Sequence, residues 1–163
     1  CIKDAALFEK IAGYADDAAL LADIDSVVAT CCAIKARIVE QDEFDTGLRM
    51  LLNFGHTLGH AVEQHFGYSC FTHGEGVAIG MYQLTKRTEE LGMTAKGSAE
   101  RIKSVLEKYN LPLTAGVEKA QLLDTMARDK KKNGNSITLI ILQQIGEGVL
   151  QKVDWQEVPK YLG

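Results

Sequence analysis

The sequence predicts a mainly α-helical domain with one small β-hairpin near its C-terminus. Apolar residues recur every three or four positions through most of the chain, which is the spacing of helices that bury one face. Only two prolines, Pro112 and Pro159, occur in the 163 residues, so few positions force a helix to end. An alternating apolar pattern first appears at residues 137–153, and this pattern predicts the hairpin.

The first forty residues predict two helices. One covers Lys3–Tyr14, and a longer one runs from Asp17 to Glu40. Lys35 falls within the apolar stripe of the longer helix, so its ammonium group either reaches past the stripe to water or faces a polar cavity. The stripe is formed by Leu21, Ile24, Val28, Cys31 and Ile38.

The next helix contains a group of histidines and is expected to end near Gly67. Its start is open, because Asn53 can serve as an N-cap and would then leave Arg49 in the preceding loop. A further helix follows His73, and Gly92 is a suitable stop signal for it.

The remaining elements follow from capping and turn residues. Ser98 can cap a helix that ends before Pro112, and residues 118–129 predict another helix. In the hairpin, β-branched residues flank a glycine-containing turn at Ile145–Gly148. Asp154–Glu157 has the pattern of a capping box before a final short helix.

Composition excludes several classes of protein. Hydrophobic residues make up 46% and charged residues 25% of the chain, which is ordinary for a soluble globular domain. The net charge of −4 argues against nucleic acid as the main partner, and the longest apolar run, residues 137–142, is too short to cross a membrane. The four cysteines form no C-x-x-C pair and no signal peptide is present, so we expect free thiols and a cytoplasmic protein.

Polar side chains recur on one face of the histidine-containing helix. His56 and His60 are four positions apart, so a helix presents both rings on one side, either as a metal-binding pair or as ordinary surface or core histidines. Asn53 and Glu63 extend this face, and such a polar row is costly to bury unless it binds something. His65 lies off the face, and we expect it to be exposed to solvent.

Two other segments have open interpretations. His73-Gly74-Glu75 begins the next helix, and its glycines allow either tight helix packing or the close approach of a ligand. The run Lys130-Lys131-Lys132 lies in a polar stretch before the hairpin. Charge runs are usually solvated, but one lysine turned inward would suit a phosphate or a carboxylate.

The motifs resemble those of 3-dehydroquinate synthase, a sugar-phosphate cyclase family of the shikimate pathway of aromatic amino acid biosynthesis. The relevant segments are Arg49-x-Leu-Leu-Asn53-Phe-Gly-His56-Thr-x-Gly-His60-Ala-x-Glu63, then His73-Gly-Glu75-x-Val-Ala-Ile-Gly-Met81, and Asp129-Lys-Lys before the hairpin. The resemblance extends over essentially the whole chain. It implies a lyase that converts 3-deoxy-D-arabino-heptulosonate 7-phosphate into 3-dehydroquinate and phosphate, with NAD and zinc or cobalt as cofactors.

The resemblance also implies roles for individual residues. His56 and His73 would be two of three protein ligands to the metal, with a glutamate outside this sequence as the third. His60 and Lys35 would be catalytic, and Arg49, Asn53 and Lys131 would bind the substrate, although the three consecutive lysines leave the choice among Lys130, Lys131 and Lys132 open. Spacing alone would instead pair His56 with His60.

The sequence contains no G-x-G-x-x-G loop after a predicted strand. We therefore expect residues 1–163 to be the C-terminal metal- and substrate-binding helical domain, with an N-terminal NAD-binding α/β domain outside this sequence. The chain alone should be inactive, and the whole enzyme should be a homodimer. The alternatives are another sugar-phosphate cyclase, the helical half of an iron- or zinc-dependent polyol dehydrogenase, and a helical module without catalytic activity.

Overall fold

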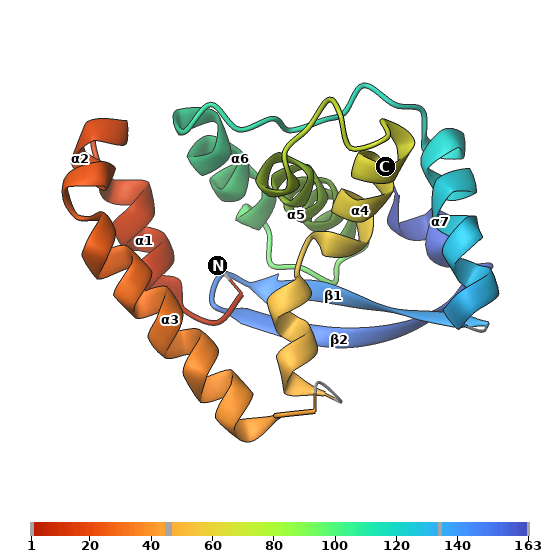
Figure 1. Cartoon of the computed structure of the whole chain (residues 1–163), viewed down its shortest axis with the longest axis horizontal. Coiled ribbons are helices and arrows are strands. Elements are labelled where there is room, and N and C mark those ends of the chain that lie inside the picture. The colour runs from red at the N-terminus through yellow and green to blue at the C-terminus, as the bar shows by residue number, and fades with distance from the viewer. Residues whose placement is uncertain (1, 45–46, 134, 163) are drawn as a thin grey trace.

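The computed structural model describes residues 2–44, 47–133 and 135–162, with the side chains of 128–133 outside the described set. It is mainly helical with one antiparallel hairpin, which confirms the predicted fold class. The N-terminal arm, formed by α1, α2 and α3, stands to one side of the body (Figure 1). Its helices span Ala5–Gly13, Asp17–Ala22 and Ile24–Gln41.

The prediction of one continuous helix over residues 17–40 was wrong. The helix breaks at Asp23, whose carboxylate accepts a hydrogen bond from the Tyr14 hydroxyl at 2.6 Å and pairs with Lys10 at 2.7 Å. The predicted apolar stripe was confirmed at Ile38, which is buried, but was wrong at Val28. Val27 is buried, whereas Val28 is 51% exposed, because the helix that restarts after Asp23 turns a neighbouring row of residues inward.

Helices α4 and α5 span His56–His65 and His73–Glu90 and cross at glycines. A Cβ atom at Gly59 would lie 2.9 Å from the Gly76 carbonyl oxygen, and one at Gly80 would overlap the Gly55 carbonyl oxygen. The two backbones therefore touch directly, as glycine alone permits. This crossing holds the first turn of α5 beside α4.

The start of α4, which the sequence left open, lies beyond Asn53. A 3₁₀ helix, η1, covers Leu48–Asn53, and α4 begins at His56 with Gly55 as its N-cap. Gly55 has φ +82°, a left-handed conformation that favours glycine. Asn53 is therefore the last residue of η1, and Arg49 lies within that helix and not in a loop.

The hairpin pairs β1, Ser136–Gln144, with β2, Glu147–Asp154. It runs beneath α4 and α5, with α7 at its far end (Figure 1). The other helices are α6, Ser98–Lys108, α7, Lys119–Asn133, and the 3₁₀ helix η2, Val158–Tyr161. Two hydrophobic clusters join these elements, one around Phe54, Ile102 and Ile140 and the other around Leu58, Ile141 and Val158.

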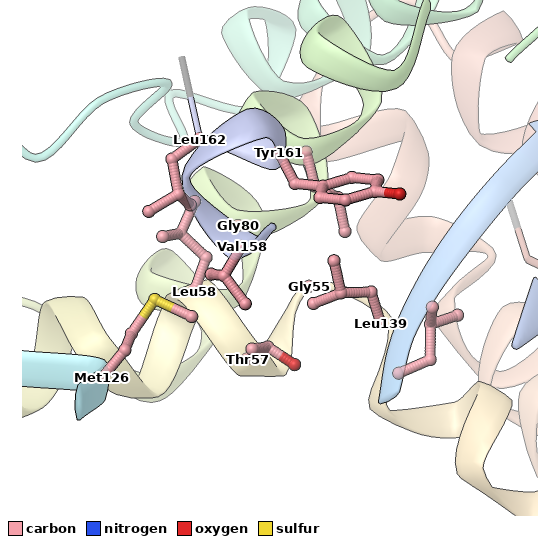
Figure 2. Close-up of a pocket in the computed structure, with 11 residues that line it drawn as sticks. Gly55, Thr57, Leu58, Gly80, Met126, Leu139, Val158, Tyr161 and Leu162 are labelled. Atoms are coloured by element: carbon pink, nitrogen blue, oxygen red, sulfur yellow. The ribbon is translucent and has the colours of Figure 1, made fainter. Parts of the chain in front are cut away.

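A small apolar pocket lies within the second cluster, between α4, β1 and η2, and its free space is only about 20 Å³. Figure 2 shows Leu58, Val158 and Leu162 around it, with the Thr57 and Tyr161 hydroxyls among the side chains drawn. Its lining is that of a packing gap in the core and offers no set of polar groups for chemistry. Over the described ranges, none of the helices combines the length and hydrophobicity needed to cross a membrane.

Candidate metal and substrate site

Three histidine rings converge where α4 and α5 meet. The ring centroids are 5.0 Å apart for His56 and His73, 5.5 Å for His56 and His60, and 5.7 Å for His60 and His73. Metal–nitrogen bonds of about 2.0–2.1 Å to zinc bring rings on one ion to similar separations. Spacing favoured the 56–60 pair and the family resemblance favoured the 56–73 pair, and the structure brings all three rings together. His65 instead packs its ring against Phe66.

Hydrogen bonding distinguishes the three rings. Nδ1 of His56 lies 3.3 Å from the Phe54 carbonyl oxygen, and Nδ1 of His73 lies 3.3 Å from both carboxylate oxygens of Glu63. These acceptors favour a proton on Nδ1 and leave the Nε2 lone pair free. Among the described residues, no hydrogen bond is found for the His60 ring, which is exposed.

Electrostatics favour a neutral ring at His56. Burial lowers the pKa of His56, partly offset by the hydrogen bond to the Phe54 carbonyl, and the nearby His60 and His73 rings lower it further. An unprotonated imidazole is the form that binds metal ions. His56 is therefore suited to coordination at neutral pH.

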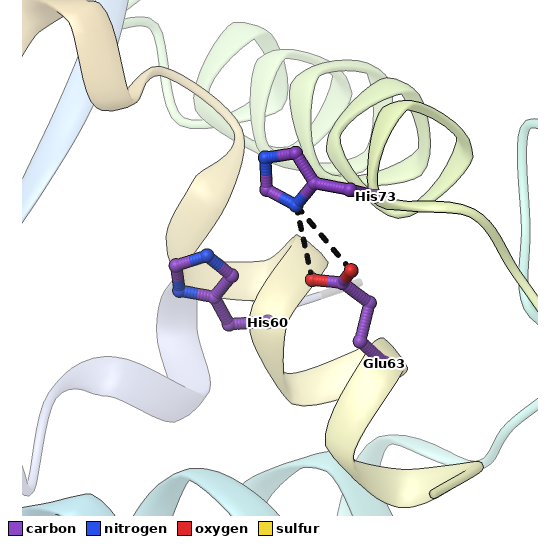
Figure 3. Close-up of side chains that lie close together, drawn as sticks. All are labelled: His60, Glu63 and His73. Carbon is purple, nitrogen blue, oxygen red and sulfur yellow. Dashed lines mark hydrogen bonds and ion pairs between the residues drawn. The ribbon is translucent and has the colours of Figure 1, made fainter. Parts of the chain in front are cut away.

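Glu63, which the sequence placed on the polar face of α4 without a specific role, belongs to the site. It is 7% exposed and faces His73 across the α4–α5 crossing (Figure 3). His60, Glu63 and His73 also offer ligand atoms that all lie within 4.8 Å of one another. The sequence signal was available, because Glu63 lies seven positions after His56 on the same helical face.

An open hollow of about 460 Å³ lies next to His56. Lys35 from α3, together with Arg49 and Asn53 from η1, lines it. Lys35 is exposed and borders a polar hollow, which is one of the two alternatives that the sequence left open. Cys31 and Leu52 complete the lining.

The backbone and side chain of Arg49 are both held in place. Its N–H donates to the Asp42 carboxylate at 2.9 Å, and its guanidinium donates to the Glu43 carbonyl oxygen at 2.9 Å. The Gly47 N–H donates to the same Asp42 oxygen at 2.8 Å. Lys131, which was predicted to bind substrate, has a side chain outside the described residues.

The site therefore places a cluster of imidazoles beside a hollow that is lined by His56 and by cationic and amide side chains. Such a set can hold a divalent cation beside an anionic ligand. Residues 1–132 match the family described as 3-dehydroquinate synthase C-terminal, and the chain belongs to that family.

Comparison with curated relatives supports the same assignment. The chain is 45% identical to the 3-dehydroquinate synthase of Clostridium acetobutylicum over 99% of its own length and 46% of the relative's. The corresponding enzyme of Enterococcus faecalis is 36% identical over 99% of the chain and 45% of the relative. The chain thus spans less than half the length of these relatives.

Solved structures share the fold at lower identity. The 2-epi-5-epi-valiolone synthase of Streptomyces hygroscopicus, with NAD+ and Zn2+ bound, has a TM-score of 0.75 and 20% identity over 98% of this chain and 46% of its own. A 2-deoxy-scyllo-inosose synthase complexed with carbaglucose-6-phosphate, NAD+ and Co2+ has a TM-score of 0.70 and 19% identity, covering 85% of this chain and 40% of that one.

Proposed function

We propose that this chain is the metal- and substrate-binding part of a 3-dehydroquinate synthase. The reaction would convert 3-deoxy-D-arabino-heptulosonate 7-phosphate into 3-dehydroquinate and phosphate. The observation that carries the proposal is the meeting of His56 and His73, each with Nδ1 next to an acceptor, beside a hollow lined by Lys35 and Arg49. Family membership and the naming of the relatives support it.

His56 and His73 would hold the zinc or cobalt ion through Nε2, with a third ligand from a glutamate outside this sequence. The donor set fits such an ion, because neutral imidazoles are common zinc ligands and both Nδ1 positions already have acceptors. When bound, the metal supplies a Lewis acid for a substrate oxygen. His60 lacks an acceptor for its ring among the described residues, and this leaves it available to exchange a proton with the substrate.

The side chains of the hollow would hold the rest of the substrate. The planar guanidinium of Arg49 suits a carboxylate, and the ammonium of Lys35 suits a hydroxyl or phosphate oxygen. Asn53 can both donate and accept hydrogen bonds with hydroxyl groups. Together they would orient the substrate against the imidazoles, which is where most of their effect on rate would arise.

NAD would be bound mainly by an N-terminal domain outside this sequence, where it supplies hydride chemistry. The structures with TM-scores of 0.75 and 0.70 contain NAD+ in chains of which this one covers less than half. We therefore propose that the 163 residues alone are inactive. We also propose that the whole enzyme is a cytoplasmic homodimer and that neither nucleic acid nor a membrane is a partner.

The proposal is tested by joining this chain to the N-terminal part of the Clostridium acetobutylicum enzyme and measuring phosphate release from the heptulosonate phosphate. The chimera should be active with NAD and Zn2+, and the chain alone should not be. His56→Ala and His73→Ala should each reduce the rate by at least about 100-fold, whereas His65→Ala, outside the cluster, should not. Turnover by the chain alone, or a chimera that binds NAD and metal without releasing phosphate, would contradict it.

Another sugar-phosphate cyclase is the second candidate, because the two solved relatives described above are cyclases of other products. Two cationic side chains at the hollow favour a substrate with a carboxylate in addition to phosphate. Arg49→Met in the chimera should therefore raise KM for the heptulosonate phosphate. A chimera that prefers a sugar phosphate without a carboxylate would favour the second candidate.

A further inference from the structure

We infer that Glu63 is a positioning residue, whose carboxylate accepts the Nδ1 proton of His73 and so presents the Nε2 lone pair to the metal. The inference rests on the proposed function, because it takes His73 as a metal ligand. Outer acceptors of this kind fix the tautomer and orientation of a ligating imidazole and raise its basicity.

The geometry of the pair supports this role. Both carboxylate oxygens of Glu63 lie 3.3 Å from Nδ1 of His73, so the carboxylate faces that nitrogen symmetrically. The Glu63 side chain is 8% exposed, whereas that of His73 is 57% exposed. Figure 3 shows the second ring nitrogen of His73 turned away from the carboxylate. The inner side of the ring is thus paired and its outer side is open.

The α4–α5 crossing holds Glu63 in this position. A Cβ atom at Gly76 would lie 3.2 Å from Cγ of Glu63, so the Glu63 stem packs against the bare backbone of α5. A buried carboxylate is costly unless it is paired, and the hydrogen bonds found for its oxygens within the described ranges lead to His73. Glu63 therefore has little freedom to face elsewhere.

A direct ligand role for Glu63 is the alternative, since His60, Glu63 and His73 could together surround an ion. That set would leave out His56, whose Nδ1 also lies beside an acceptor, the Phe54 carbonyl oxygen. The same arrangement thus occurs at both proposed ligands and is not found for His60 among the described residues. This repetition favours an outer role for Glu63.

The test measures Co2+ affinity by calorimetry, and the His73 tautomer by ¹⁵N NMR of the metal-free chain at alkaline pH. Glu63→Met removes the acceptor and should weaken Co2+ binding by about 10–100-fold while shifting His73 away from the Nδ1–H tautomer. Glu63→Gln keeps an acceptor oxygen, so it should preserve the tautomer and lose less affinity. Glu75→Gln is the matched control, because the Glu75 carboxylate bonds Thr72 and not the ring, and it should change neither measurement.

Two results would overturn the inference: a Glu63→Met chain with unchanged tautomer and unchanged Co2+ affinity, or loss of one Co2+ ligand from the visible spectrum of both Glu63 variants. Failure of the proposed metal site itself would give a result different from both of these outcomes. In that case the unaltered chain would bind no Co2+, in the presence or absence of the N-terminal part of a relative, and the NMR measurement would still report on the Glu63–His73 pair.

Discussion

Helices α3 and α5 are equally long, at 18 residues each, yet they are embedded very differently. In α3 the buried residues are Val27 and Ile38. In α5 they are Gly76, Ala78, Ile79, Gly80, Leu84, Thr85 and Thr88. Burial here follows from how closely a neighbouring backbone can approach, since glycines allow α4 to touch α5 directly and α3 has no glycine.

The candidate site draws on both kinds of helix. His56, Glu63 and His73 come from the glycine crossing, whereas Lys35 comes from the N-terminal arm. The helices of the arm are joined in part by exposed polar contacts such as the Lys10–Asp23 pair. Exposed ion pairs of this type contribute little stability. We therefore expect the metal-binding groups to be rigidly placed and Lys35 to be more adjustable.

The largest loss of stability is expected from adding one methyl group at the α4–α5 crossing. In Gly80→Ala the new Cβ would overlap the Gly55 carbonyl oxygen, and backbone cannot yield as a flexible side chain does. The free energy of unfolding should fall by about 3 kcal/mol or more, and Co2+ affinity should fall with it.

Gly13→Ala is the matched change in the arm, because a Cβ there meets no atom within 4 Å. It should be neutral or stabilise the chain by up to about 1 kcal/mol through helix propensity. Chemical denaturation of the two variants measures both values. Equal effects at the two positions would contradict the contrast between the crossing and the arm.

The sequence predicted the hairpin, most helices and the histidine group, because these follow from periodicity, caps and residue spacing. It did not predict the break at Asp23, where the carboxylate contacts Lys10 of α1 and Tyr14 just after that helix. The pairing of Glu63 with His73 was also missed. It requires knowing how α4 and α5 cross, and short-range spacing within one helix contains no such information.

A smaller loss of stability is expected from breaking a chain of buried hydrogen bonds that connects α5 to β1. The Thr94 hydroxyl lies 2.6 Å from that of Thr88 and donates to the Leu142 carbonyl oxygen at 2.7 Å. Thr94→Val should lower the free energy of unfolding by about 1–3 kcal/mol, because it leaves buried polar atoms unpaired.

Thr85→Val is the control within the same core. Its buried hydroxyl has no hydrogen-bond partner in the part of the chain that the structure describes, so the change should be neutral or stabilising. In the arm, Ser26→Ala removes an exposed hydroxyl that accepts from Lys10 and should leave Tm unchanged. A large loss from Thr85→Val, measured by thermal unfolding, would show that its hydroxyl is paired after all.

The smallest effect is expected in the arm, where Asp23→Asn should change the dependence of stability on pH. Hydrogen bonds from Lys10 and then Tyr14 lower the pKa of Asp23 in the folded chain. The contribution of Asp23 to stability is therefore complete above the pKa that Asp23 has in the unfolded chain. It is lost as pH falls through the lower pKa of the folded chain. The hydrogen bonds to Asp23 raise the pKa of Lys10 and of Tyr14 in the folded chain. The contributions of these two groups to stability are therefore lost as pH rises through their raised pKa values. The difference in stability between the two proteins should therefore be greatest near neutral pH and shrink at both extremes. Urea unfolding across pH measures it, and a difference for Asp23→Asn that stays constant from acid to alkaline pH would show that the cluster does not stabilise the arm.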